Sequence, residues 1–405
     1  MNYKMIIGND IGNGCVKGSI DLDGKIENFD FPSMIAIDGK PKKPISDPQE
    51  IEETISSFYE EIELSIESSA VASNMKKYVV GKKALTKDFV REFDVNSSET
   101  KADDELSYVL ILSSIAARAI RQYYYKEKKL PEENINIDAN IALALPINEY
   151  VKGEEITYKK QLNGKHICTV YNFETPIIVQ ISFSADKVIV VPEGAAAQIA
   201  IRSLDDKIIK SMIADAKEYG MDIDISCDEI KQTTTFAGID VGDGTTNFPI
   251  FSELNFDRDL SKSINVGHGK LLEEAVEYLE DNYEVSFSSR KDLANFLANE
   301  PNENSSKIVK RNYNAIKDIV IEKEDELART IAKSFNRLLP KSKPDIIYVY
   351  GGGAVPLKKS LFNELSKSAK AGMMGEEKIP VLYMSDDISR FLNRDGLFLI
   401  ANRLS

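Results

Sequence analysis

The spacing of hydrophobic positions divides the chain into short strand-like runs and longer stretches with a helical period. Apolar runs at 188–191 and 345–350 predict buried strands, and each is followed by a predicted helix, the second at 354–365. A proline near the start of that second helix is tolerated in a first helical turn. Residues 391–404 carry apolar side chains at helical spacing, which predicts a helix near the C-terminus.

Two further regions have patterns of their own. Residues 32–98 mix short apolar runs with an acidic stretch at 47–65 that predicts a helix. Residues 271–335 are predicted to be mainly helical. A glycine-containing segment at 369–378 predicts a flexible surface loop. The helices expected in the second region lie at 271–279, 290–297 and 308–339.

The chain contains an internal repeat, since residues 7–14 match residues 237–244. Both copies begin with apolar residues, carry an aspartate before a glycine-rich turn and continue into a second strand-like run, which predicts two β-hairpins. Two unrelated hairpins with common turn residues are the alternative, but that leaves unexplained why an aspartate occupies one fixed position in both. The matching residues are Gly8, Asp10, Gly12 and Gly14 with Gly238, Asp240, Gly242 and Gly244.

These hairpins suit the binding of a polyphosphate. Glycines lack a Cβ, so that backbone N–H groups can approach phosphate oxygens. An aspartate just before the turn places a carboxylate where it can hold a hydrated Mg²⁺. Two such hairpins that face one another would grip a polyphosphate from both sides. The chain contains no P-loop motif, and no dinucleotide-binding glycine pattern follows its first strand.

Glycines and small residues mark two more places. The three glycines at 351–353 leave a flat backbone surface for an adenine, although a plain strand-to-helix turn is the alternative. Gly194 and Ala195 in one predicted helix and Gly396 in another would let these helices cross closely, as at a hinge between lobes. For Gly396, ordinary helix packing explains the glycine equally well.

Composition limits the partners and the setting. The chain has 65 Asp and Glu against 51 Lys and Arg, a net charge of −14 that disfavours direct binding of nucleic acid. Basic clusters at 40–43 and 126–129 are interpreted as solvated surface. Three widely spaced cysteines and two histidines indicate a reducing cytoplasm and disfavour a zinc site. We find no signal peptide and no membrane-spanning apolar run, so we expect a soluble, cytosolic protein.

Taken in order, these motifs resemble the five nucleotide-site motifs of the actin, sugar-kinase and heat-shock ATPase superfamily. The first hairpin and the segment Pro192-Glu193-Gly194 most resemble the bacterial plasmid-segregation actins, the ParM type. The resemblance implies an α/β, actin-like (ribonuclease H-like) fold with two duplicated lobes, four subdomains and a central nucleotide cleft. Lobe I is expected at 1–191, with an insertion at 32–98 and the helix 391–405 packed back on it. Lobe II is expected at 192–390, with an insertion at 271–335.

The resemblance also implies roles for particular residues. Asp10 and Asp240 would hold Mg²⁺ through water, and Lys17 would contact the β- and γ-phosphates. Glu193 would orient or deprotonate the attacking water, with Asp10 and Asp240 as the other catalytic residues. Two departures from the superfamily matter, because Pro192 precedes the glutamate and Asn247 replaces an aspartate of several relatives. Glu193 also has a plainer interpretation, as an acid favoured by a helix N-terminus.

Nucleotide contacts follow from the same resemblance. Thr245 and Thr246 would bind phosphate through backbone and hydroxyl groups, and the glycines at 351–353 would pack on the adenosine. Lys270 and Glu274 would face adenine and ribose, although a solvated lysine at a helix start is the alternative for Lys270. The full expected set is Gly12, Asn13, Gly14, Lys17, Gly242, Asp243, Gly244, Thr245, Thr246, Lys270, Glu274, Gly351, Gly352 and Gly353.

The function implied is that of a filament-forming ATPase. ATP binding would favour head-to-tail self-association, and hydrolysis to ADP and phosphate would weaken the polymer. The plasmid-segregation actins imply that plasmid DNA is moved through a DNA-binding adaptor protein of the ParR type. GTP stays open as an alternative nucleotide. A small-molecule (sugar or acid) kinase of the same superfamily is the alternative function.

Overall fold

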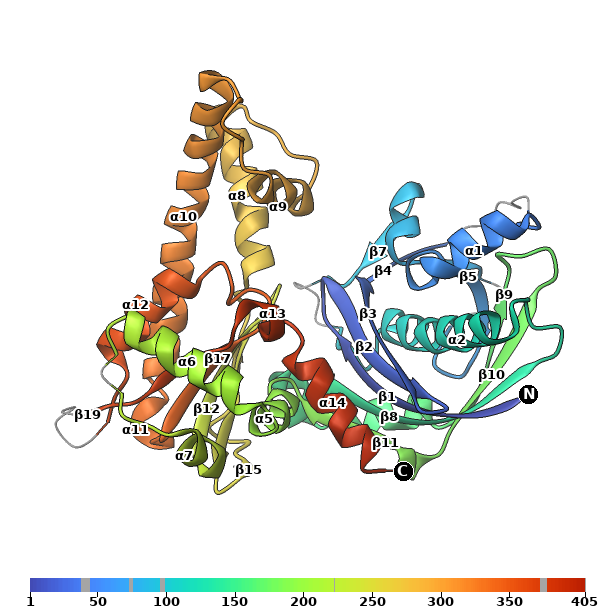
Figure 1. The fold of residues 1–405 in the computed structure, drawn as a ribbon, viewed down its shortest axis with the longest axis horizontal. Coiled ribbons are helices and arrows are strands. Elements are labelled where there is room, and N and C mark those ends of the chain that lie inside the picture. The colour runs from blue at the N-terminus through green and yellow to red at the C-terminus, as the bar shows by residue number, and fades with distance from the viewer. Residues whose placement is uncertain (38–43, 73–75, 95–98, 222, 372–376, 405) are drawn as a thin grey trace. The chain divides into compact units, whose positions relative to one another are not determined.

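A computed structural model describes residues 1–37, 44–72, 76–94, 99–221, 223–371 and 377–404. The chain divides into two compact units, which are described separately here (Figure 1). Unit 1 comprises Met1–Ala200 and Asn393–Ser405, and unit 2 comprises Ile201–Leu392. The predicted lobe limits at 191 and 390 remain predictions. The predicted basic cluster at 40–43 and half of the predicted loop at 369–378 lie outside the described residues.

The main sheet of unit 1 is built around its first strand. This strand, β1, pairs antiparallel with β2 on one side and parallel with β8 on the other. Strand β2 in turn pairs antiparallel with β3. The second half of β8 pairs in parallel with β11, which gives the order β3-β2-β1-β8-β11. The bounds are β1 Asn2–Ile11, β2 Cys15–Leu22, β3 Lys25–Pro32, β8 Ile135–Leu145 and β11 Val188–Pro192.

The insertion of unit 1 continues this sheet and departs from one prediction. From the first half of β8 the sheet runs on through β10, β9, β5, β6, β4 and β7. The prediction of one acidic helix over 47–65 is wrong for the second half of this range. Helix α1 (Pro48–Ser56) ends there early, and residues 63–67 form a strand. Leu64 and Ile66 are buried there and alternate with more exposed neighbours, the period of a strand. The strand bounds are β4 Met34–Ile37, β5 Glu63–Glu67, β6 Tyr78–Val80, β7 Val90–Glu92, β9 Gly164–Val170 and β10 Ile177–Phe183.

Three helices complete the part of unit 1 that matters for the site. Helix α2 (Glu105–Glu127) begins at the N-cap Asp104 and packs against β1, β2, β9 and β10, with most of its residues buried. The predicted C-terminal helix is confirmed as α14 (Leu392–Asn402). A Cβ on Gly396 would lie 1.8 Å from the carbonyl oxygen of Ala196 in α5 (Ala195–Arg202), so the close crossing is confirmed. The bounds of the remaining elements are α3 Ile147–Lys152, α4 Glu154–Leu162, η1 Phe58–Glu60, η2 Gly81–Thr86 and η3 Ala185–Lys187.

Unit 2 repeats the same strand order. Its central strand pairs antiparallel with β13 and parallel with β17, and the order is β16-β13-β12-β17-β20. Pro249 interrupts the second strand, so that β14 continues the pairing with the central strand. The bounds are β12 Phe236–Val241, β13 Thr246–Phe248, β14 Ile250–Ser252, β15 Asn255–Phe256, β16 Lys262–Ile264, β17 Ile346–Tyr350 and β20 Val381–Tyr383.

The helices predicted in the second half of unit 2 are confirmed, whereas their assignment to an insertion subdomain stays a prediction. Helices α8 (His268–Tyr283) and α10 (Lys307–Asn336) run side by side away from the sheet, and α9 (Arg290–Ala298) packs on α8 (Figure 1). The helix predicted to start at 354 begins later, as α12 (Lys358–Ser368), because turns occupy the residues after the glycines. No helix within the described ranges has the length and apolarity to cross a membrane. The remaining bounds are α6 Asp206–Glu218, α7 Cys227–Gln232, α11 Leu339–Ser342, α13 Asp386–Ser389, β18 Lys370–Ala371 and β19 Glu377–Lys378.

Candidate functional site

The two repeated hairpins have the same register. In each hairpin the aspartate on the first strand pairs with the residue seven positions later on the second strand. The residue after the aspartate pairs with the residue five positions after itself, nearer to the turn. The first turn glycine donates its N–H to a carbonyl, Gly12 to Cys15 at 3.2 Å and Gly242 to Thr245 at 2.9 Å. The sequence repeat is therefore a structural repeat. The paired residues are Asp10 with Lys17, Ile11 with Val16, Asp240 with Asn247 and Val241 with Thr246.

In unit 1 the aspartate of the hairpin is buried among charges. Asp10 is 6% exposed, and the Nζ of Lys17 lies 3.9 Å from its carboxylate. Burial raises the pKa of Asp10, an effect that Lys17 opposes and Glu193 reinforces. Gly12, Asn13 and Gly14 form the partly exposed turn next to it. The predicted residues of the first hairpin therefore lie together at one end of β1.

Glu193 lies at the same edge of the sheet. Its backbone N–H donates to the carbonyl of Leu145 at the end of β8, 2.7 Å away, and its side chain is only 9% exposed. The next residue, Gly194, has a φ of +81° and donates its N–H to the side chain of Asn393. The carboxyl ends of the parallel strands β1, β8 and β11 thus bring Asp10 and Glu193 to one edge, where parallel sheets bind ligands.

Two residues at this edge escaped the sequence analysis. The Nζ of Lys101 donates to the carboxylate of Glu193 at 2.9 Å and to the carbonyl of Ile11 at 2.7 Å. The backbone N–H of Lys101 donates to Glu149, also at 2.9 Å. Burial raises the pKa of Glu149 to about 7, although Lys101 lowers it. A single lysine in a polar segment and a glutamate in a short helix give no local signal that could have singled them out.

In unit 2 the site is built from close backbone contacts. Gly351 has a φ of +99°, and a Cβ there would lie 2.4 Å from the carbonyl oxygen of Val241 and 2.5 Å from the carboxylate of Asp240. A Cβ on Gly353 would lie 2.7 Å from the carbonyl oxygen of Gly242. Gly351 and Gly353 therefore lie directly against the second hairpin, at a distance that excludes side chains, whereas a Cβ on Gly352 would meet only Arg390.

The start of α8 packs against the same hairpin. The N–H groups of Gly269 and Lys270 donate to the carbonyl of Asp243, and that of His268 donates to the carbonyl of Gly242. The carboxylate of Asp243 forms an ion pair with Arg290 at 2.8 Å. Asp243 thus links the turn to two helices, and its expected nucleotide contact stays a prediction.

The hydroxyl of Thr246 departs from its expected role. Its side chain is fully buried, and its hydroxyl donates to the carbonyl of Val266 at 2.7 Å. The hydroxyl is therefore used within the protein, and the expectation that it binds phosphate has to be corrected. Gly242, Asp243 and Thr245 remain partly exposed, whereas Gly244 is buried. Asp240 and Asn247 are buried next to this turn.

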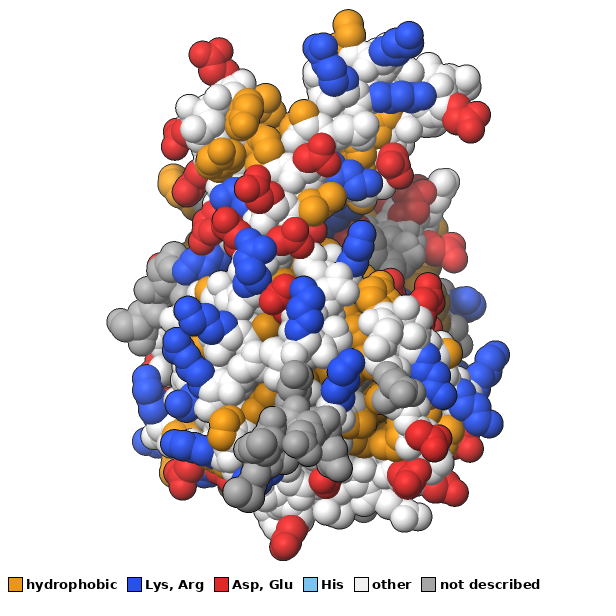
Figure 2. Space-filling model, turned by 90° about the vertical axis from the view of Figure 1, so that its left-hand side faces the viewer, with side chains coloured by type: hydrophobic (Ala, Val, Ile, Leu, Met, Phe, Trp, Pro, Cys, Tyr) orange, Lys and Arg blue, Asp and Glu red, His pale blue; other side chains and the backbone are white. Residues whose placement is uncertain are grey.

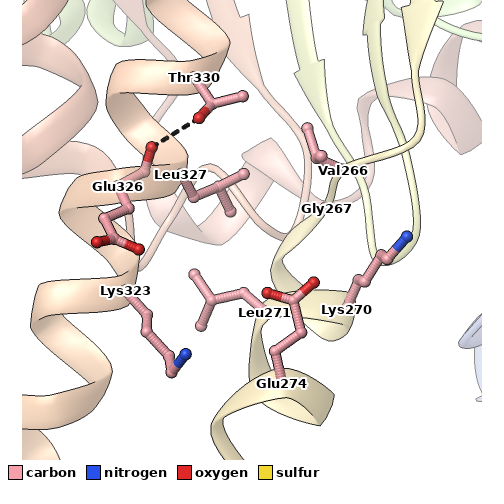
Figure 3. A pocket seen from close by; sticks show the side chains of 9 residues that line it. All are labelled: Val266, Gly267, Lys270, Leu271, Glu274, Lys323, Glu326, Leu327 and Thr330. Atoms are coloured by element: carbon pink, nitrogen blue, oxygen red, sulfur yellow. Dashed lines mark hydrogen bonds between the residues drawn. The ribbon is translucent and has the colours of Figure 1, made fainter.

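A pocket opens beside this hairpin, between α8 and α10 (Figure 3). Lys270 and Glu274, which were predicted to face a nucleoside, both line it, and Lys323 projects towards it from α10. Its volume is about 160 Å³, below the roughly 300–1,000 Å³ of pockets that enclose a whole ligand. The lining residues are Val266, Gly267, Lys270, Leu271, Glu274, Lys323, Glu326, Leu327 and Thr330.

The donor groups fit a metal ion that arrives with its nucleotide. Among the described residues, no group of three or more His, Cys, Asp or Glu side chains could enclose a metal ion. Each hairpin offers one buried aspartate next to a glycine turn, Asp10 or Asp240. Mg²⁺ in nucleotide sites is held by one or two carboxylates together with phosphate oxygens and water. The residues present are therefore compatible with Mg²⁺.

The duplicated strand order, with one aspartate-glycine hairpin in each copy, defines an actin-like α/β fold. Comparison with known families agrees. Residues 8–195 match the N-terminal domain of actin-like proteins, and residues 238–363 match the C-terminal domain of the archaeal actin homologue MreB-like family. The chain belongs to the actin-like superfamily. No curated protein sequence matches it.

Solved structures show the same fold over the whole chain at low identity. ParM of Bacillus thuringiensis with ATP is 18% identical, with a TM-score of 0.61 over 99% of this chain and 98% of that one. Ta0583, an archaeal actin homolog, is 14% identical, with a TM-score of 0.64 over 98% and 99%. The actin-like protein Alp7A is 17% identical, with a TM-score of 0.63 over 100% and 97%.

Proposed function

We propose that the protein is an ATPase that assembles into filaments when it binds ATP and leaves them after hydrolysis. The observation that carries this proposal is the matched pair of aspartate-glycine hairpins, one in each unit. Each places a buried carboxylate beside a glycine turn, an arrangement that suits a nucleotide polyphosphate with its metal ion. The similarity to a ParM structure solved with ATP supports the same nucleotide. Both hairpins would bind one ATP molecule.

The residues of unit 1 would carry the chemistry. Lys17 neutralises charge on the β- and γ-phosphates, and Glu193 orients the attacking water and accepts its proton. Asp10 and Asp240 hold the water shell of Mg²⁺, which neutralises phosphate charge when bound. In unit 2 the glycines at 351–353 and the pocket around Lys270 and Glu274 hold the nucleoside.

The main test combines phosphate release with sedimentation. Purified protein is mixed with magnesium and ATP, with a non-hydrolysable ATP analogue, with ADP or with no nucleotide. We expect pelleting above a critical concentration with ATP and the analogue, phosphate release with ATP alone, and little polymer with ADP. Hydrolysis that requires an added small-molecule acceptor, without pelleting at any concentration, would favour the kinase. A protein that binds no nucleotide would refute the proposal.

An exposed apolar patch in the insertion of unit 1 supports self-association. It consists of Ile37, Leu85, Phe89 and Val90, and the side chain of Phe89 is 83% exposed. Val90 lies on β7, which is an edge strand of the sheet. Exposed apolar side chains next to a strand edge are typical of surfaces that bind another protein. We propose that a second copy of the chain covers this patch in the filament.

Substitution of Phe89 tests this role. Phe89→Glu is expected to raise the critical concentration for assembly at least about 10-fold, since a charge in a protein interface costs a few kcal/mol. Nucleotide binding by the monomer is expected to stay unchanged. The matched control is Ile156→Glu, which places the same charge on an exposed apolar residue elsewhere in the same unit, on α4. Equal effects of the two substitutions would show that the patch has no special part in assembly.

We further propose that the filament moves plasmid DNA through an adaptor protein. The net charge of −14 disfavours direct contact with DNA. On the side of unit 2 that carries α10 and α12, Lys and Arg side chains are interspersed with Asp and Glu (Figure 2). Gel-shift assays with plasmid DNA should therefore show no binding by filaments alone at physiological salt. Tight binding without any adaptor would contradict this part of the proposal.

A further inference from the structure

One buried lysine connects the three parallel strands that carry the chemistry of unit 1. Lys101 lies in the segment before α2, and its side chain is 6% exposed. Its ammonium group binds the carbonyl of Ile11 at the end of β1 and the carboxylate of Glu193 just after β11. Its backbone N–H binds Glu149, which follows β8.

We propose that Lys101 is the positioning residue for Glu193. This inference rests on the proposed ATPase function, and it concerns the side chain that makes the catalytic glutamate effective. The ammonium group fixes the carboxylate of Glu193 relative to the hairpin that carries Asp10. A general base works only when its carboxylate is held at the correct place relative to the attacking water.

Charge balance at this edge explains why a lysine is needed. A carboxylate that is buried without a cation tends to take up a proton, and it then loses its value as a base. Burial disfavours the charge on Lys101, but Glu193, followed by Glu149 and Asp10, outweighs that effect, and the pKa of Lys101 is raised. Lys101 therefore remains a cation when it is buried, and its charge stabilises the acidic groups around it.

The lysine also fixes geometry. Ile11, whose carbonyl binds Lys101, is the last residue of β1, and Asp10 comes directly before it in the same strand. By binding this carbonyl and Glu193 together, the ammonium group sets the distance between the hairpin and the catalytic carboxylate. The hydrogen bond from the Lys101 backbone to Glu149 in turn holds the lysine in place.

A double-mutant cycle on hydrolysis tests the inference. Lys101→Met removes the charge and keeps the length, and Glu193→Gln removes the base. We expect Lys101→Met to lower kcat on the order of 10- to 100-fold, while the affinity for a fluorescent ATP analogue changes less than about 3-fold. Since Lys101 acts through Glu193, the double variant should be no slower than Glu193→Gln alone. Lys101→Arg, which restores the charge, should recover part of kcat.

Two further measurements separate positioning from a general structural role. The acid limb of the kcat profile should move to higher pH in Lys101→Met, because the base loses its cation. The matched control is Lys76→Met, which breaks another lysine–glutamate pair, with Glu105 at the start of α2. This control should leave both kcat and its pH profile unchanged.

The outcomes are distinguishable. Additive losses in the double variant, or an equal loss of kcat in Lys76→Met, would overturn the role of Lys101 and leave the ATPase proposal standing. A fall in nucleotide affinity as large as the fall in kcat would also overturn it. A wild-type protein that binds ATP but does not hydrolyse it would refute the proposed function itself, and the role of Lys101 with it.

Discussion

The two hairpins share a register but differ in what surrounds them. Asp10 pairs across the strands with Lys17, a cation, whereas Asp240 pairs with Asn247, whose side chain is a neutral amide. Around the first hairpin the contacts are between charged side chains, with Lys101 and Glu193 at the end of the strand. Around the second hairpin most of the close contacts are between backbones and are made possible by glycines, with the ion pair between Asp243 and Arg290 as an exception. A duplicated element has thus been adapted in two ways, and we infer that unit 1 supplies the catalytic carboxylate and a lysine for the phosphates, whereas unit 2 holds the nucleoside.

The largest expected effect tests the catalytic half of this division. Glu193→Gln removes the base and keeps the size of the side chain, so kcat should fall about 10²- to 10⁴-fold. Nucleotide affinity should change little, because the binding contacts lie elsewhere. Single-turnover hydrolysis and equilibrium titration measure the two quantities separately. A variant with wild-type kcat would show that Glu193 is only an acid at a helix N-terminus.

The next effect tests the binding half. Gly351→Ala places a Cβ against Val241 and Asp240 in a backbone conformation that costs roughly 1–3 kcal/mol for a residue with a side chain. We expect a lower unfolding temperature and a loss of nucleotide affinity of at least about 10-fold. The matched control is Gly352→Ala, whose Cβ would meet only Arg390, at 3.8 Å. It should keep the stability of the wild type and lose affinity only if Gly352 packs on the adenosine.

Exchange of the paired residues addresses the difference between the hairpins directly. Lys17→Asn gives the first hairpin the residue of the second, and the affinity for ATP should fall about 10-fold, as expected for the loss of one charge-assisted contact. The affinity for AMP, which lacks the β- and γ-phosphates, should be unaffected. Equal losses for ATP and AMP would mean that Lys17 acts by supporting the fold.

Local chemistry explains which parts of the site the sequence could predict. Both hairpins and the strand before the three glycines depend on turn residues and on local spacing along the chain. The crossing at Gly396 joins distant segments, but small residues mark it in each helix. Lys101 was missed because its partners are distant in sequence and meet only through the sheet. The acidic helix was predicted too long because a charged surface hid the strand period of Leu64 and Ile66. The hydroxyl of Thr246 was assigned to phosphate because burial cannot be read from a glycine-rich turn.

The smallest effect concerns pH and Glu149. Its pKa is raised to about 7 by burial, so the folded protein binds a proton that the unfolded chain releases at lower pH. The contribution of Glu149 to the free energy of unfolding is complete below the pKa that this group has in the unfolded chain. It is lost as the pH rises towards 7. Glu149→Gln carries no such proton, and its stability relative to wild type should therefore rise between pH 5 and pH 8, by on the order of 1 kcal/mol.

Denaturant unfolding of the two proteins at several pH values measures this difference. The matched control is Glu132→Gln, since Glu132 is an exposed glutamate that pairs with Lys129 on the surface of the same unit. Its stability relative to wild type should not depend on pH over this range. A flat difference for Glu149→Gln as well would show that the charges at this strand edge balance without it. In that case the contrast between charged side chains around the first hairpin and backbone contacts around the second would rest on Lys17, Lys101 and Glu193 alone.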